Sequence, residues 1–271
     1  MNAALPPRAP AVAGAFYPGS SREISLVMQR WGLGPGGGRP ARMVMCPHAG
    51  WVYSGAIAAQ TLARVRVPER VVLLGPNHTG VGPTASLWSG GPWELPGGEV
   101  PIDEPLRQAI ARRSPVTLDR SAHAREHSLE VLAPLLRARR PDVRIVPLVL
   151  GPLAATDCLA LGRDLAAAIA EIDPGTLIVA SSDMSHYIPA EAAARLDELA
   201  LAQLLALDPE NLYRTVRARH ITMCGVVPVT TALAAARLLG ARRAELVRYG
   251  NSGETSGDDE RVVGYAGVVV E

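Results

Sequence analysis

The apolar residues of the chain follow two spacings that recur in turn. Several short stretches are continuously apolar and rich in β-branched residues, which is typical of strands covered on both faces. The predicted strands are Arg42–Cys46, Arg70–Leu74, Ile145–Leu150, Thr176–Ala180, Leu246–Tyr249 and Arg261–Val270. Between them, apolar residues recur about every 3.6 positions in stretches rich in Ala and Leu, which predicts helices. The predicted helices are Ala56–Leu62, Glu104–Arg113, Ser128–Arg139, Thr156–Ile172, Ala190–Leu205 and Val226–Leu239.

The order of these elements predicts the fold class. Strands that alternate with helices form βαβ units, so we expect an α/β fold with a central, largely parallel or mixed sheet and helices on both of its faces. The stretches rich in Gly and Pro at Gly34–Arg39 and Gly90–Gly98 are predicted loops, too short to link two domains. A chain of 271 residues can bury a large core by itself. We therefore expect one domain over residues 1–271 that needs no structural metal.

Composition excludes several kinds of chemistry. The 27 basic residues are all Arg, so no lysine is available for a Schiff base, for pyridoxal phosphate or for a nucleotide-binding P-loop. The net charge of +1 gives no reason to expect a nucleic acid or a membrane as partner, and no apolar stretch reaches membrane-spanning length. Three widely separated cysteines argue against a disulfide framework. We expect a cytoplasmic protein, because no apolar leader follows Met1 and free thiols suit a reducing compartment.

Histidines follow three of the predicted strands. His48, His78 and His186 each lie in the loop after a different strand. Ligands of α/β sheets bind outside the carboxyl ends of the strands, so these loops are expected at the edge where a site forms. A single histidine in a loop is more often structural than functional, but three in equivalent loops indicate a common site. Asp183 shares its loop with His186 and is a further candidate.

Cys224 is another candidate for the site. It lies two residues before the predicted helix Val226–Leu239. A helix N-terminus lowers the pKa of a nearby thiol and favours the thiolate, the form that binds metals or attacks electrophiles. The alternative is a buried, inert cysteine. That is the interpretation we give to Cys46, within a predicted strand, and Cys158, within a predicted helix.

The segment 126–130 contains a histidine between two carboxylates. Ser128 is placed to cap the predicted helix that follows, which would put His127 at the helix start. His127 is equally consistent with an exposed helix-start histidine and with a site residue. His123 lies four residues earlier, but the stretch is not typical of a helix, so the two histidines form only a weak metal motif. We predict that His220 is not a ligand.

Short motifs occur along the chain in the order found in one protein family. They are AGAFYP at 13–18, PHAGW at 47–51, GPNH at 75–78, EHSLE at 126–130, SSDMSH at 181–186, MCG at 223–225 and GYA at 264–266. By these motifs the chain resembles the Memo family, whose bacterial and archaeal members are called AmmeMemoRadiSam system protein B. The resemblance extends over nearly the whole chain.

The resemblance implies a fold similar to that of class III extradiol ring-cleaving dioxygenases. Those enzymes hold Fe(II) with two histidines and a carboxylate, whereas Memo proteins are thought to use two histidines and a cysteine. Carried over by motif, the metal ligands are His48, His78 and Cys224. Other residues that the resemblance places around the same pocket are His127, Asp183 and His186.

Three functions are consistent with such a site. A non-haem metal oxidoreductase would hold one metal ion per chain, with Fe(II) expected first and Cu or Zn next. There, His127 or His186 would move protons, Asp183 would orient a ligand or a water, and the substrate would be a small molecule, with aromatic compounds as candidates. A zinc-type hydrolase would use Glu130 or Asp183 as its base. A non-catalytic module would use the pocket to bind a peptide or an anion. The family name also implies a radical-SAM protein and an AMMECR-type domain as partners.

Overall fold

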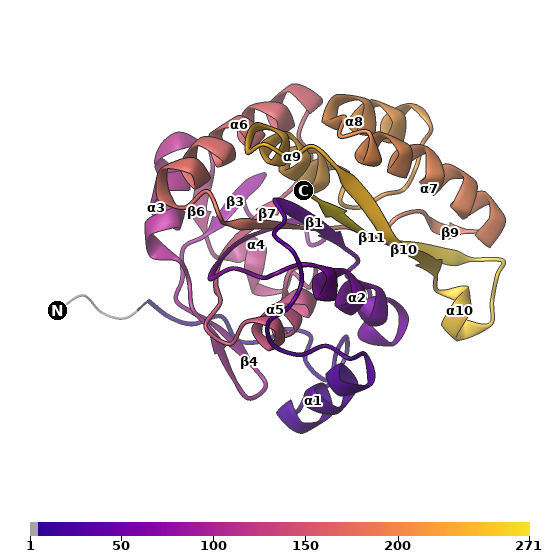
Figure 1. Cartoon of the computed structure of the whole chain (residues 1–271), viewed down its shortest axis with the longest axis horizontal. Coiled ribbons are helices and arrows are strands. Elements are labelled where there is room, and N and C mark those ends of the chain that lie inside the picture. The colour runs from indigo at the N-terminus through magenta and orange to yellow at the C-terminus, as the bar shows by residue number, and fades with distance from the viewer. Residues whose placement is uncertain (1–4) are drawn as a thin grey trace.

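A nine-stranded sheet forms the centre of the computed structural model, which describes residues 5–271 (Figure 1). From one edge to the other, the strands are β10 (Ala244–Asn251), β11 (Val262–Val270), β1 (Met43–Cys46), β8 (Leu177–Ser181), β2 (Arg70–Pro76), β7 (Arg144–Leu150), β3 (Ala85–Trp88) and β6 (Thr117–Asp119), with β9 (His186–Ile188) paired to β11. A separate hairpin consists of β4 (Trp93–Leu95) and β5 (Gly98–Val100). Residues 1–4 lie outside the described residues. They begin the N-terminal segment in which no apolar leader is expected.

The sheet is mixed. Its four middle strands, β1, β8, β2 and β7, run parallel to one another. β11 is antiparallel to both β1 and β10, and β3 is antiparallel to β7. The parallel centre follows from its helical connections, since parallel neighbours need a long crossover between them. The expected α/β class, with a sheet that is largely parallel or mixed, is therefore confirmed in its mixed form.

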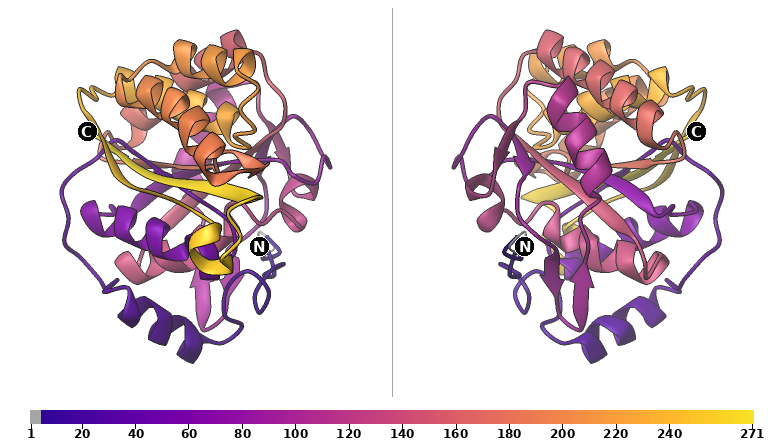
Figure 2. Two further views of the ribbon diagram at one scale, coloured as in Figure 1. Left: turned by 90° about the vertical axis from the view of Figure 1, so that its right-hand side faces the viewer. Right: turned by 90° about the vertical axis from the view of Figure 1, so that its left-hand side faces the viewer.

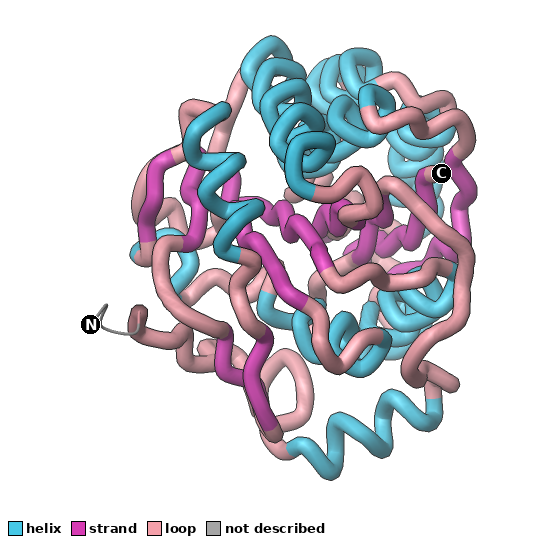
Figure 3. The backbone as a smooth tube through the Cα atoms, turned by 60° about the vertical axis from the view of Figure 1, so that its left-hand side comes forward, coloured by secondary structure: helices cyan, strands magenta, loops and turns pink. Residues whose placement is uncertain are grey.

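Helices cover both faces of this sheet (Figures 1, 2 and 3). One layer consists of α3 (Glu104–Arg113), α6 (Ala155–Ile172), α7 (Ala190–Leu205), α8 (Pro209–Ala218) and α9 (Val226–Leu238). The opposite layer consists of α1 (Ser21–Arg30), α2 (Ala56–Arg64) and α5 (Ala133–Arg139). The helices α4 (Ser121–Ala124) and α10 (Gly253–Ser256) are single turns. Among residues 5–271, no helix has the length and apolar character that a membrane span requires.

The strand β1 shows why its sequence is continuously apolar. Met43 and Met45 pack into the core under α6 and α9, whereas Val44 and Cys46 pack into the core under α2. All four side chains are fully buried, because successive strand residues point to opposite faces and both faces are covered. The buried position of Cys46 agrees with its interpretation as an inert core residue.

Some elements differ from those predicted. The helix expected over Ser128–Arg139 begins later, because residues Glu130–Leu132 form a 3₁₀ turn and α5 starts at Ala133. Ser128 does not cap a helix, since its hydroxyl donates to the carbonyl of Pro76 at 3.2 Å. The elements that the apolar pattern did not predict are α1, α4, α8, α10, β3, β6, β9, the hairpin β4–β5 and a π-helical turn over Trp51–Gly55.

Candidate metal centre

Histidines that follow neighbouring parallel strands lie at one edge of the sheet. The strands β1, β8 and β2 lie next to one another, and His48 and His78 each follow the last residue of their strand by two positions. His186 begins β9, directly after the loop that leaves β8. Because the carboxyl ends of parallel strands share an edge, all three loops meet on one side of the sheet.

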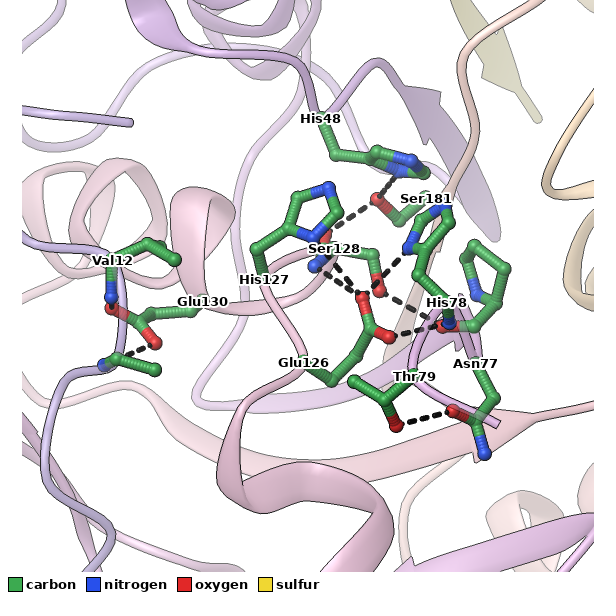
Figure 4. A network of polar contacts seen from close by, with 12 residues as sticks. Val12, His48, Asn77, His78, Thr79, Glu126, His127, Ser128, Glu130 and Ser181 are labelled. Carbon is green, nitrogen blue, oxygen red and sulfur yellow. Dashed lines mark hydrogen bonds and ion pairs between the residues drawn. The ribbon is translucent and has the colours of Figure 1, made fainter. Parts of the chain in front are cut away.

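His127 joins His48 and His78 in a compact cluster (Figure 4). One ring nitrogen of each histidine lies within 4.8 Å of the corresponding nitrogens of the other two. The rings of His78 and His127 stack with their centroids 4.6 Å apart, and the centroid of His48 lies 5.1 and 5.5 Å from them. His127, expected only as a proton-transfer group, thus lies as close to the centre as the two histidines expected as ligands.

The hydrogen bond at His48 Nδ1 leaves the lone pair of the ring on Nε2, where it can bind a metal. Its Nδ1 lies 2.7 Å from Ser181 Oγ, and that hydroxyl donates its own hydrogen to the Ser128 carbonyl at 2.7 Å. Ser181 therefore accepts a hydrogen from Nδ1, so the lone pair of the neutral ring is on Nε2. Burial, with a further contribution from His78, holds the pKa of His48 well below its usual range. The neutral ring is the form that ligates metals.

Glu126 orients His78 in the same way. Its carboxylate accepts from His78 Nδ1 at 2.8 Å, from the His78 main-chain nitrogen at 2.6 Å and from the Ser128 main-chain nitrogen at 2.9 Å (Figure 4). Burial by itself would raise the pKa of Glu126, but these hydrogen bonds and the neighbouring His78 lower it to about 2. An ionised Glu126 keeps the hydrogen of His78 on Nδ1 and leaves Nε2 as the free donor.

Cys224 contacts the cluster from the loop between α8 and α9. Its Sγ lies 3.2 Å from His48 Nε2 and 3.3 Å from the main-chain nitrogen of Asp183, which donates to it. The pKa of this thiol is raised, first by burial and then by the charge of Asp183. The prediction that the helix N-terminus lowers the pKa of Cys224 is therefore wrong for the chain without a metal. Desolvation of the thiol outweighs the effect of the helix dipole.

Asp183 contacts His48, and His186 lies three residues further along the chain. Asp183 Oδ1 accepts from the His48 main-chain nitrogen at 2.7 Å, and Oδ2 lies 4.0 Å from His48 Nε2. Burial raises the pKa of Asp183 to about 7, although hydrogen bonds from the main chain of His48 and Ala49 partly oppose the rise. The His186 main-chain nitrogen donates to Thr222 Oγ1 at 2.7 Å, and burial lowers the pKa of its ring.

Known proteins are similar in sequence to this chain over nearly its whole length. The model of the family described as Memo-like protein matches residues 8–269. The chain belongs to this family. It is 43% identical over 264 residues to a "MEMO1 family protein" of Aquifex aeolicus, which covers 97% of this chain and 98% of the relative. It is 37% identical over 277 residues to "MEMO1 family protein MK0963" of Methanopyrus kandleri, with 97% and 98% covered.

A solved structure shares the fold of this Memo-like protein. It is described as uncharacterized protein JW3007 from Escherichia coli K12. The TM-score is 0.55 at 18% sequence identity, and the match covers 85% of this chain and 100% of the other. At this identity the likeness shows the fold alone.

Glu130 does not face the histidine cluster of this Memo-like protein. Its carboxylate pairs with Arg8 at 2.7 Å and also accepts from the main chain of Ala11 and Val12 and from the Tyr17 hydroxyl. Figure 4 shows the carboxylate directed toward Val12. All its acceptor sites are occupied, so the contacts do not support the expected role of Glu130 as a base. They give it a structural role instead.

Besides His186, two further histidines lie outside the cluster. His123 is buried between the rings of Trp88 and Trp93, and its Nε2 lies 3.2 Å from the Ser86 carbonyl. Burial lowers its pKa to about 4, so this ring is a neutral core residue. His220 is exposed in the loop before Cys224.

We expect Glu126→Gln to weaken metal binding by about 10–100-fold, the usual cost of losing the partner that orients a histidine ligand. The amide can satisfy only part of the present arrangement, because one of its two terminal groups is a donor that would face the donors of His78 and Ser128. Metal affinity would be measured by competition with a chelator. Glu99→Gln, at an exposed carboxylate in β5, serves as the control. Unchanged affinity would show that Glu126 does not set the orientation of a ligand.

Proposed function

We propose that this protein is a metal-dependent oxidoreductase of the non-haem Fe(II) type that acts on a small aromatic substrate. His48, His78 and Cys224 would hold the metal. The observation that carries the proposal is the pair of fixed imidazoles: Ser181 and Glu126 each occupy a Nδ1 atom, so both Nε2 atoms are left as potential ligand atoms. The Cys224 thiol lies 3.2 Å from the Nε2 of His48.

The donor set fits a metal of this kind. Two neutral imidazoles and a thiol suit Fe(II), Cu or Zn better than Mg²⁺ or Ca²⁺, which prefer oxygen ligands. Three protein ligands leave coordination positions open for a substrate and for O2, which closed structural sites do not. When bound, Fe(II) would supply the activation of O2.

The residues of the chain have separate roles around that metal. Asp183 holds the loop of His48 through its main-chain nitrogen and reaches toward the same ring with its second oxygen. His127, stacked on His78, and His186, in the adjoining loop, are the groups placed to give or take a proton at the substrate. Neither Cys46 nor Cys158 takes part, because both are buried in the core.

The test is metal analysis of protein purified without oxygen, followed by oxygen-electrode assays with 1,2-dihydroxybenzenes. We expect one iron per chain and oxygen uptake that is lost in His78→Ala together with the metal. Purified protein that holds zinc and consumes no oxygen would favour a hydrolase. Of the two bases expected for that reaction, Asp183 would remain, since Glu130 is paired with Arg8. Protein that binds no metal would reduce the pocket to a binding module.

A further inference from the structure

A cavity of about 520 Å³ opens beside Cys224. Its walls come from the ends of β2 and β7, the last turn of α8, the loop over residues 220–224 and the start of α9. Cys224 belongs both to this wall and to the histidine cluster, since its Sγ lies 3.2 Å from His48 Nε2. A molecule that fills the cavity can therefore reach the candidate metal centre. The volume is within the range of small-molecule sites, about 300–1,000 Å³.

Some of the polar side chains that line the cavity already form hydrogen bonds within the protein, and others do not. The amide of Asn77 is used within its own turn, where it accepts from Gly80 and donates to the Val81 carbonyl. Thr222 accepts from the main chain of His186. The side chains left to bind a ligand are thus few, and no Asp or Glu is among the lining residues.

Arg217 lines this wall and forms no ion pair with the described residues. Its guanidinium lies 5.2 Å from the centre of the Tyr213 ring, and within residues 5–271 no carboxylate oxygen comes within ion-pair distance of it. His220 stands on the same wall with a left-handed backbone, at a φ of 52°. A residue other than Gly is rarely held in that conformation, and such strain is concentrated at binding sites. The wall also has an apolar part, which includes Leu150, Ile221 and Val226.

We propose that this cavity binds an organic anion, an apolar body that carries a carboxylate, with Arg217 as the group that holds the carboxylate. This proposal rests on the proposed function in one respect: it names the organic anion as the substrate class of the proposed oxidoreductase. A guanidinium offers two parallel N–H donors that match a carboxylate, and its partner ring fixes its position without consuming those donors. The apolar part of the wall then covers the body of the ligand. The other end of the ligand lies near Cys224, which is beside the metal centre.

The experiment compares two probes of the same shape, 3-phenylpropanoate and 3-phenylpropan-1-ol, by titration calorimetry on metal-free and on iron-loaded protein. We expect the carboxylate to bind both forms and the alcohol to bind at least 10-fold more weakly. Arg217→Gln should weaken carboxylate binding on the order of 10–100-fold, as the loss of a charged hydrogen bond does. Arg214→Gln, on the same helix but outside the cavity, should leave it unchanged.

The outcomes separate this proposal from the proposed function. His48→Ala should lose the metal yet keep carboxylate binding, because Arg217 does not depend on the metal. Equal affinity for the two probes, no saturable binding of the carboxylate, or an Arg217→Gln variant that binds as the unmodified protein does, would overturn the proposal. So would binding that appears only with iron and disappears in His48→Ala, because the metal would then hold the carboxylate. Failure to bind metal, with anion binding intact, would overturn the oxidoreductase alone.

Discussion

Arg8→Met should lower the free energy of unfolding by about 3–5 kcal/mol, the usual cost of leaving one charge of a buried ion pair without its partner. The side chains of Arg8 and Glu130 are 2% and 0% exposed, so solvent cannot compensate the carboxylate once the guanidinium is gone. A chain of this length should then melt about 6–10 °C lower, at roughly 2 °C for each kcal/mol.

The contacts of Arg8 explain why the effect should reach the metal centre. Its guanidinium donates to the carbonyls of His123 and Glu126, both at 2.8 Å, and lies 4.4 Å from the centre of the Trp93 ring. It therefore ties the N-terminal segment to the loop that carries Glu126 and His127. Loss of these bonds frees that loop, so we expect Arg8→Met to weaken metal affinity as well as stability.

The measurement is thermal and denaturant unfolding of metal-free protein, with a double-mutant cycle over Arg8 and Glu130. In a Glu130→Gln background, Arg8→Met should cost less, because no buried charge is then left unpaired. Arg195→Met is the control, since Arg195 pairs with Glu191 on an exposed helix face and such pairs contribute at most about 1 kcal/mol. Equal costs for Arg8→Met and Arg195→Met would show that the buried pair does not anchor the segment.

The sequence predicts the middle of the fold better than its edges. Strands such as β1 and β2 are covered on both faces, so almost every residue in them is apolar and the pattern is unmistakable. The edge strands β6 and β9 are three residues long and carry exposed positions, so no such pattern exists. The start of α5 was misplaced because Ser128, a residue typical of helix caps, bonds to Pro76 instead.

The candidate site shows the same division between local and tertiary information. That His48 and His78 follow strands can be predicted locally, because the carboxyl ends of parallel strands mark the edge where ligands bind. The closeness of His127 depends on how the loop over residues 126–128 folds back over the strand ends, which no spacing reveals. Glu126 could have been noticed as a carboxylate beside His127, but the imidazole that hydrogen-bonds to it is that of His78, 48 residues away.

Cys224→Ser should weaken metal binding by more than about 100-fold, beyond the 10–100-fold expected of a residue that only orients a ligand. The thiol pKa is raised by burial in the metal-free chain, so a bound cation is what would stabilise the thiolate, and serine cannot replace it. The unmodified protein loaded with Cu(II) or Co(II) should show a sulfur-to-metal charge-transfer band that Cys224→Ser lacks. Cys158→Ser, at a buried thiol in α6, is the matched control for both measurements.

The two competing ligand sets make opposite predictions in the same assay. If His127 is the third ligand, as its place in the three-histidine cluster permits, His127→Ala should lose the metal while Cys224→Ser keeps it and no sulfur band is seen. If Asp183 is the third ligand, Asp183→Ala should be the damaging change. Under the assignment made here, His127→Ala and Asp183→Ala should both retain most of the metal. His127→Ala should lose activity by about 10²–10⁴-fold, because His127 is assigned as a proton-transfer group. If Cys224→Ser retains the metal, the thiol is only a neighbour of the metal centre. The third ligand is then His127 or Asp183, whichever residue loses the metal when it is replaced by alanine.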